Sequence, residues 1–173
     1  MSDKKAVGVE TIGMTMRFGG FTALDAVSVK VPAGSFHALL GENGAGKSTL
    51  VKCMMGFYHP TSGDILVDGR EVAIASPRDA SALGLGMVYQ HFTLVASLTG
   101  AENLVISRAE VPRIIDWSSE RKALGSFMER MPFKLPLDVP VRELAAGEKQ
   151  KLEIIKQLYL GRHFLVLDEP LRC

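Results

Sequence analysis

The sequence is poor in cysteine and has no long apolar run, and both shortages narrow the class of protein. Only Cys53 and Cys173 occur in 173 residues, too few for the disulfide framework of a small secreted domain. No stretch approaches the roughly eighteen apolar residues that a membrane-spanning helix needs, and the first ten residues lack the apolar segment of a secretory signal. We therefore expect a reducing cytoplasm, with Cys53 as a small buried apolar residue.

Neither sign of charge is in excess. Twenty Lys and Arg residues face nineteen Asp and Glu residues, which leaves a formal charge of +1. The basic residues are scattered, so nothing favours nucleic acid or an anionic membrane as a direct partner. With 47% hydrophobic and 23% charged residues, the composition is that of one soluble globular domain with a sizeable core.

The hydrophobic pattern predicts an α/β fold. Apolar and polar residues alternate over 9–16 and 23–31, as in a half-buried antiparallel pair. Short apolar segments are typical of parallel strands buried on both faces, and we predict three of them at 36–41, 83–90 and 164–168. A further strand pair is expected at 65–69 and 71–75. Helices are expected over 47–57, 116–131 and 147–160, and from the start signals Ser76-Pro77 and Thr99 with Glu102.

A glycine-rich segment between the first predicted buried strand and the helix that follows it has the spacing of a phosphate-binding loop. GENGAGKST matches G-x-x-x-x-G-K-[ST] at Gly41, Gly46, Lys47 and Ser48. Glycines let consecutive N–H groups point at phosphate oxygens at a helix N-terminus. Lys47 can reach the β- and γ-phosphates, and the Ser48 hydroxyl can bind Mg²⁺. The alternative, a chance glycine-rich turn, is disfavoured by the strand before and the helix after.

Two adjacent carboxylates follow the last predicted strand. Asp168 comes directly after FLVL and is placed to bind Mg²⁺, directly or through water. The Glu169 side chain points away from that of Asp168, because successive side chains of a strand lie on opposite faces. Glu169 could act as general base on the attacking water. Alone, an Asp-Glu-Pro sequence could be a solvated strand end. Together with the phosphate loop it predicts a site that binds and hydrolyses a nucleotide.

These segments together resemble a known family. GENGAGKST, the glutamine of MVYQHF, ELAAGEKQKLEI and FLVLDEP occur in the order found in the ATP-binding domain of an ABC transporter, over about Val9 to Pro170. The sequence between these motifs is similar to that of the first ATPase domain of importers for simple sugars and nucleosides. In that group one chain usually carries two such domains. The resemblance implies ATP and Mg²⁺ as cofactors and a P-loop NTPase core, mostly a parallel sheet, with an N-terminal antiparallel β subdomain and a helical insertion.

The resemblance also implies roles for individual residues and regions. Phe18 occupies the place of an aromatic ring that stacks on adenine, although it could instead be a core residue beside a glycine turn. Gln90 matches a glutamine that contacts Mg²⁺ and connects the site to the membrane partner. The nucleotide-binding set is Phe18, Gly41, Asn43, Gly44, Ala45, Gly46, Lys47, Ser48 and Thr49; the catalytic set is Lys47, Gln90 and Glu169; the metal set is Ser48, Gln90 and Asp168. The antiparallel part is expected at about 1–34, the core at 35–96 and 161–170, and the helical subdomain at 97–160.

One loop departs from the family pattern. The signature loop, which closes over the γ-phosphate bound by the opposite ATPase domain, corresponds to Leu144, Ala145, Ala146, Gly147 and Glu148. The family usually has a serine and often two glycines where Ala145 and Ala146 stand. Ala145 has no side-chain hydrogen bond to offer, whereas Gly147 can still present its backbone N–H. We expect a loop that supports nucleotide binding better than turnover.

The chain end departs from the pattern more strongly. In the family, LDEP precedes a threonine, an aspartate-bearing loop, another strand and a histidine that contacts the γ-phosphate. Here Leu171, Arg172 and Cys173 follow instead, and we expect a truncated or frameshifted product with a foreign tail and part of the fold missing.

The resemblance implies an ATPase that drives uptake of a sugar or nucleoside through a separate membrane permease. The implied partners are that permease, a second ATPase domain and, indirectly, a solute-binding protein, which would hold the chain on the inner face of the cell membrane. The alternative is a non-catalytic nucleotide-binding module with little ATPase activity. A soluble ABC protein of repair or translation is disfavoured, because its usual basic regions are absent.

Overall fold

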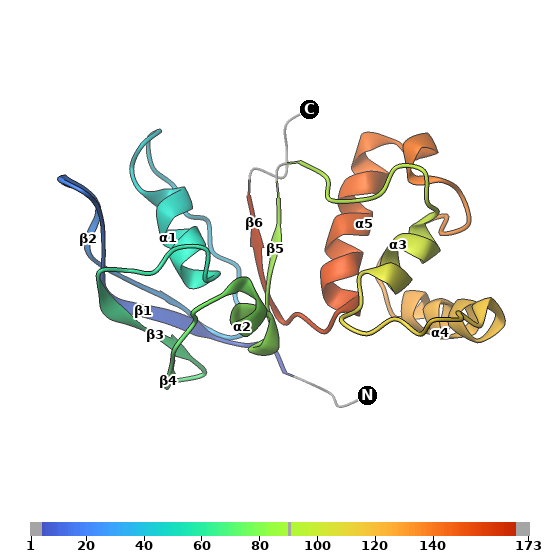
Figure 1. Ribbon diagram of the computed structural model, residues 1–173, viewed down its shortest axis with the longest axis horizontal. Coiled ribbons are helices and arrows are strands. Elements are labelled where there is room, and N and C mark those ends of the chain that lie inside the picture. Colours follow the sequence, from blue (N-terminus) through green and yellow to red (C-terminus); the bar gives the residue numbers. More distant parts are fainter. Residues whose placement is uncertain (1–4, 90, 169–173) are drawn as a thin grey trace. The chain divides into compact units, whose positions relative to one another are not determined.

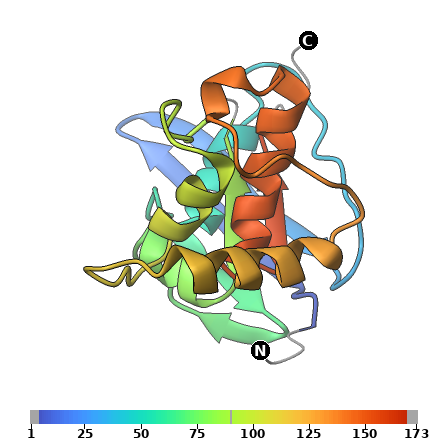
Figure 2. The same ribbon diagram turned by 90° about the vertical axis from the view of Figure 1, so that its right-hand side faces the viewer.

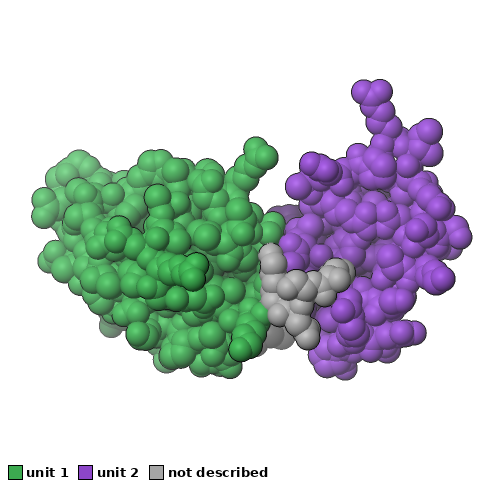
Figure 3. Space-filling view, turned by 90° about the horizontal axis from the view of Figure 1, so that it is seen from below, with its two compact units in different colours: residues 1–87, 162–166 green, residues 88–161, 167–173 purple. Residues whose placement is uncertain are grey.

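The computed structural model describes residues 5–89 and 91–168, and these form two compact units. The first unit comprises residues 1–87 and 162–166, and the second comprises residues 88–161 and 167–173, coloured separately in Figure 3. Each unit has its own cluster of buried apolar side chains. We describe each unit by itself.

The first unit contains a four-stranded antiparallel sheet in the order β2-β1-β3-β4 (Figure 1). The strands are β1 (Val9–Phe18), β2 (Phe21–Val31), β3 (Ser62–Val67) and β4 (Arg70–Val72). The predicted antiparallel pair of 9–16 with 23–31 is confirmed, but the alternation along β1 is interrupted at Gly13: Val9 and Thr11 are buried before it, and Met14, Thr15 and Met16 after it. Bulges interrupt the pairing of β1 with β2 beside Gly13, whose φ of 57° favours glycine.

Two short helices belong to the same unit. α1 (Lys47–Met54) is shorter than predicted, since the chain turns at Gly56 with a φ of 73°. An added Cβ at Gly56 would lie 2.6 Å from the carbonyl of Ser76. α2 (Pro77–Ala82) begins as predicted, with the Ser76 side chain accepting a hydrogen bond from the Asp79 N–H and proline at the first helical position.

One predicted element is wrong. Residues 36–41 form no strand, and Phe36 and Leu40 are 89% and 87% exposed. A strand of this kind is held by hydrogen bonds to neighbours on both sides. Within residues 5–89 and 91–168, no strand pairs with this segment. Its apolar sequence alone cannot form a strand, because strand structure depends on partners distant in the chain.

The other two predicted strands are present and pair with each other. β5 (Leu85–Val88) and β6 (Phe164–Leu167) form a two-stranded sheet. Only β5 is buried as predicted; β6 is half-buried, and its Leu167 is 37% exposed. The Phe164 N–H donates to the Gly84 carbonyl at 3.1 Å, and the Asp168 N–H donates to the Val88 carbonyl at 3.0 Å. The hydrogen bonds advance in the same direction along both strands, which is the parallel arrangement.

The second unit is helical (Figure 2). Its elements are α3 (Gly100–Ile106), α4 (Trp117–Glu129), the 3-10 turn η1 (Val141–Glu143) and α5 (Ala146–Tyr159). Helix α3 packs against both α4 and α5. Leu104, Leu152 and Ile155 are fully buried between these helices. The predicted capping box is confirmed: Thr99 Oγ1 accepts from the Glu102 N–H at 3.2 Å, and the Glu102 carboxylate accepts from the Thr99 N–H at 2.7 Å.

Over the part of the chain that the structure describes, we find no helix with the length and apolar character needed to cross a membrane.

Candidate functional site

The segment predicted to bind phosphate is an exposed loop that leads into a helix. Residues 41–45 are exposed, and Gly46 is the N-cap of α1 without any side-chain hydrogen bond to the helix end. The first N–H groups of a helix have no intrahelical partner. The loop therefore offers backbone donors and the positive end of the helix dipole to an anion, which is the chemistry that phosphate binding needs.

Gly46 shows why this loop needs glycine. Its φ is 85°, a conformation that costs other residues roughly 1–2 kcal/mol. An added Cβ would also lie 2.6 Å from the Ala23 carbonyl oxygen and 2.9 Å from a methyl group of Leu24. The N-terminus of α1 thus rests directly on β2, and no side chain fits between them.

The Lys47 ammonium lies in the bend of this loop. Its Nζ donates to the carbonyl oxygens of Gly41 and Glu42, each at 2.7 Å. An ammonium has three donors, and two of those on Lys47 are used by these carbonyls. The group is a positive charge beside the free backbone N–H groups, within the same loop, and can exchange a carbonyl for a phosphate oxygen.

Phe18 ends β1 at the Gly19-Gly20 turn, in the same unit as the glycine loop. The residue is 44% exposed, so the alternative of a core position is wrong. It packs edge-to-face against Tyr58, with 5.4 Å between ring centroids and an interplanar angle of 79°. Tyr58 was missed by the sequence analysis, because no motif marks this position and only folding brings it to Phe18.

Of the residues placed in the signature loop, Leu144 is buried and Ala145, Ala146 and Gly147 are exposed. Ala145 is the N-cap of α5, and its N–H donates to the Glu148 carboxylate at 2.8 Å. This is half of a capping box, because alanine has no side-chain acceptor for the helix N–H groups. The Glu148 N–H donates to the Ala145 carbonyl at 3.0 Å, so the box at this helix N-terminus lacks only its side-chain bond.

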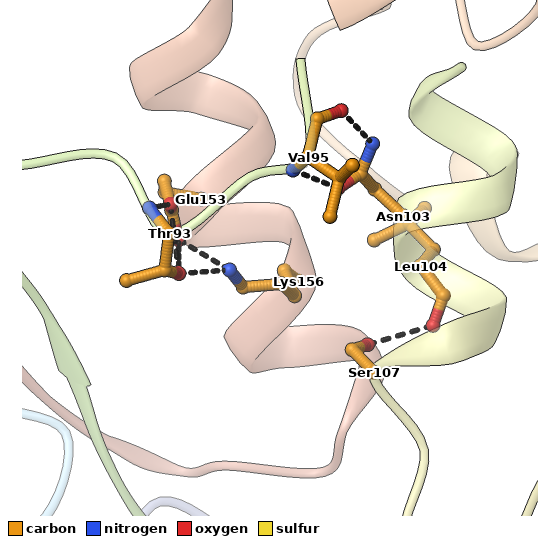
Figure 4. A network of polar contacts seen from close by, with 7 residues as sticks. All are labelled: Thr93, Val95, Asn103, Leu104, Ser107, Glu153 and Lys156. Atoms are coloured by element: carbon orange, nitrogen blue, oxygen red, sulfur yellow. Dashed lines mark hydrogen bonds and ion pairs between the residues drawn. The ribbon is translucent and has the colours of Figure 1, made fainter. Parts of the chain in front are cut away.

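A buried polar cluster, also missed by the sequence analysis, lies beside this helix (Figure 4). The Glu153 carboxylate accepts hydrogen bonds from the backbone N–H and the hydroxyl of Thr93 and forms an ion pair with Lys156. Lys156 Nζ also donates to the Thr93 hydroxyl. Burial and the Glu153 charge raise the pKa of Tyr89. The cluster ties the loop after β5 to the helix that follows the signature loop.

The Asn103 side chain forms hydrogen bonds to the same loop between β5 and α3. Asn103, on α3, is 4% exposed. Its side chain accepts from the Val95 N–H at 2.7 Å and donates to the Val95 carbonyl at 3.1 Å (Figure 4). It also donates to the Thr99 carbonyl at 2.9 Å. The loop between β5 and α3 is therefore held by buried side chains of both α3 and α5.

Asp168 directly follows β6, as expected, and its N–H is bound to Val88. The phosphate loop and Phe18 belong to the first unit, whereas Asp168 and the signature loop belong to the second. Gln90 and Glu169 lie outside the described residues.

The sequence matches the family described as ABC transporter over residues 24–172. It is 40% identical over 163 residues to a nucleoside import ATP-binding protein, NupA, of Lactococcus lactis subsp. cremoris. It is 42% identical over 165 residues to a ribose import ATP-binding protein, RbsA 1, of Rubrobacter xylanophilus. These alignments cover 94% of this chain but 32% and 33% of the relatives, so the chain spans about a third of their length.

Solved structures share the fold. A nucleotide-free ATP-binding cassette from an ABC transporter aligns with a TM-score of 0.76 at 24% identity, over 98% of this chain and 70% of that one. CbiO1 from Clostridium perfringens, part of the cbiONQ transporter complex, aligns with a TM-score of 0.78 at 26% identity, over 96% of this chain and 66% of that one.

Proposed function

This chain belongs to the ABC transporter family, and we propose that it binds Mg-ATP and, in its intact assembly, hydrolyses ATP to drive uptake of a simple sugar or nucleoside through a separate membrane permease. The observation that carries the proposal is the exposed glycine loop at the uncapped N-terminus of α1, with the Lys47 ammonium held inside it. The import proteins that the chain resembles support the solute class.

Each nucleotide group has a proposed partner. The N–H groups of Gly44 to Thr49 and the Lys47 ammonium bind the phosphates, together with Gly41 and Asn43 in the same loop. Phe18 stacks on the base, which its exposed ring permits. Leu144 to Glu148 close over the nucleotide of a second ATPase domain. The domain division, with a helical subdomain at about 97–160 between two parts of the core, remains part of the proposal.

The donor chemistry fits magnesium. Mg²⁺ usually keeps several waters and takes one or two oxygen ligands from the protein. The resemblance proposes Ser48, which is exposed on the first turn of α1, as one oxygen ligand and Asp168, which directly follows β6, as another. Across residues 5–89 and 91–168, no group of three or more His, Cys, Asp or Glu side chains could form a protein-only metal cage. When bound with ATP, Mg²⁺ would neutralise charge on the phosphate oxygens.

Gln90 and Glu169 complete the proposed machinery from the family resemblance. Gln90 would contact the metal and relay the nucleotide state to the permease, and Glu169 would act as general base on water. We place the chain at the inner face of the membrane through that permease, with a solute-binding protein as an indirect partner.

The test of binding is a calorimetric ATP titration of the unaltered chain and of Lys47→Ala. The control for overall charge is Lys122→Ala, which removes an exposed lysine of α4. We expect Lys47→Ala to abolish binding and Lys122→Ala to leave it unchanged. In the intact transporter Lys47→Ala should also abolish ATP-driven uptake. Undiminished binding or uptake in Lys47→Ala contradicts the proposal.

A second candidate is a nucleotide-binding module without turnover, favoured by the absence of a side-chain donor at Ala145. A phosphate-release assay run beside the titration separates the two functions. ATP binding without phosphate release supports the module, and phosphate release by the unaltered chain supports the ATPase. If the missing side chain at position 145 limits turnover, Ala145→Ser in the full assembly should raise it, and unchanged turnover in Ala145→Ser counts against that cause.

A further inference from the structure

The segment that follows α1 contacts the ring proposed to stack on adenine. α1 starts at the phosphate loop and ends at Met54, and Tyr58 follows four residues later. The Tyr58 ring contacts Phe18 edge-to-face, and Lys52 Nζ lies 5.2 Å from the centroid of the Tyr58 ring. Aromatic rings prefer this edge-to-face geometry, and a cation over a ring is attracted to its face. Tyr58 therefore has an aromatic neighbour and a charged one that restrict its orientation.

The backbone around Tyr58 is fixed on both sides. The Phe57 and Tyr58 N–H groups donate to the Lys52 carbonyl at 2.8 and 3.2 Å, closing the end of α1. Beyond Tyr58, the Thr61 N–H donates to the Thr15 carbonyl at 2.8 Å, and Thr61 Oγ1 accepts from the Arg17 N–H at 3.1 Å. The segment that carries Tyr58 is thus bonded to β1 directly before Phe18.

Phe18 is the last residue of β1 and pairs with Phe21 across the Gly19-Gly20 turn. An exposed ring beside such a turn needs a contact that holds it in one orientation before it can stack on a base without a large entropic cost. The contact with Tyr58 is suited to that purpose.

We propose that Tyr58 is a positioning residue for adenine-nucleotide binding, acting through Phe18, so that α1 supports the phosphates at its start and the turn that follows α1 supports the base-stacking ring. This inference rests on the proposed function, because it assumes that Phe18 stacks on the base. Tyr58 touches the neighbouring ring and not the nucleotide. Its effect is on the part of the affinity that depends on the base.

The test compares two ligands by calorimetry on the full chain: ATP, which has a base, and inorganic tripolyphosphate, which has none. Phe18→Ala should weaken ATP binding about fivefold to hundredfold. Tyr58→Leu should weaken it about threefold to tenfold, the range of an aromatic pair. Tyr58→Phe keeps the ring and should retain wild-type affinity. Tripolyphosphate should bind all four proteins equally.

Two further readouts separate positioning from general stability. Fluorescence quenching of etheno-ATP reports base stacking, and it should fall in Tyr58→Leu and recover in Tyr58→Phe. Adding Tyr58→Leu to Phe18→Ala should cause no further loss of ATP affinity, because residues that act through one another are not additive. Tyr58→Met, which fills the site with a flexible side chain, replaces Tyr58→Leu if that variant does not fold.

Three outcomes overturn the inference while leaving the proposed function intact. In the first, Tyr58→Leu loses the same affinity for tripolyphosphate as for ATP. In the second, Tyr58→Leu binds ATP as tightly as wild type, although Phe18→Ala binds it more weakly. In the third, the affinity losses of Tyr58→Leu and Phe18→Ala add up in the double variant. Unchanged ATP affinity in Phe18→Ala instead contradicts the proposed stacking itself, and the role of Tyr58 with it.

Discussion

Lys156 Nζ lies 2.7 Å from a carboxylate oxygen of Glu153, one turn earlier on α5, and both side chains are almost completely buried. A buried ion pair costs desolvation energy that its attraction offsets only when further hydrogen bonds satisfy both groups. Thr93 supplies these bonds to both partners. The ion pair thus specifies where the loop after β5 attaches to α5. It contributes little to the net free energy of unfolding.

Removing one member of this pair should be more destabilising than removing both. We expect Glu153→Leu to lower the free energy of unfolding by about 3–5 kcal/mol, because it leaves the Lys156 charge buried without its partner. The double variant Glu153→Leu with Lys156→Met should cost less than the single one. Urea unfolding of the chain measures both. If the double variant loses as much free energy of unfolding as Glu153→Leu and Lys156→Met lose together, the two charges are not coupled.

Two glycines of the phosphate loop form a matched pair for testing the close approach to β2. Gly44 and Gly46 both have a φ of 85°, but an added Cβ meets nothing within 4 Å at Gly44 and the Ala23 carbonyl at 2.6 Å at Gly46. Gly44→Ala should cost about 1–2 kcal/mol from its backbone conformation alone. Gly46→Ala should cost more, because the backbone must also move. Equal changes in the midpoint of urea unfolding would contradict the contact with β2.

The half-formed capping box of α5 predicts a stabilising substitution. Ala145→Ser adds an acceptor for the Glu148 N–H, opposite the bond already made by the Glu148 carboxylate. We expect a gain of about 0.5–2 kcal/mol in the free energy of unfolding. Ala146→Ser is the control, because a hydroxyl one residue further along is inside the helix and cannot cap it. The same gain in both variants would exclude capping as the cause.

Arg108 and Glu120 predict a pH dependence. Arg108 donates to the Glu120 carboxylate, with one bond of 2.7 Å, and also to the Tyr159 hydroxyl. These donors hold the pKa of Glu120 below its ordinary value. A lowered carboxyl pKa means that the stabilisation is complete above the ordinary value, about 4.3, and is lost as the pH falls through the folded-state pKa.

Glu120→Gln should therefore cost about 1–2 kcal/mol at neutral pH and progressively less as the pH falls below about 4. Urea unfolding at a series of pH values measures this difference against wild type. Arg108→Gln removes the partner, and in that background Glu120→Gln should have little further effect. A cost that stays constant with pH would show that the pair contributes through packing and not through charge.

Local signals located much of the fold and part of the site. Ser76-Pro77 and the Thr99–Glu102 box mark helix starts through bonds within three residues of each other. The strands of the antiparallel sheet follow from alternation, because one face is buried. The segment 36–41 was predicted wrongly for the opposite reason: its apolar residues suit a strand, but strand structure needs hydrogen-bond partners that sequence pattern does not reveal.

The sequence by itself determined the phosphate loop, the helix that follows it, and membership of the ABC transporter family, because these depend on residue types at short, fixed spacings. Only the tertiary structure decided that Phe18 is exposed and meets Tyr58, and that Thr93 meets Glu153 and Lys156. These contacts join residues 40 or more positions apart. Their formation depends on how helices and strands pack, and packing responds to shape and burial over the whole unit, which no local pattern encodes.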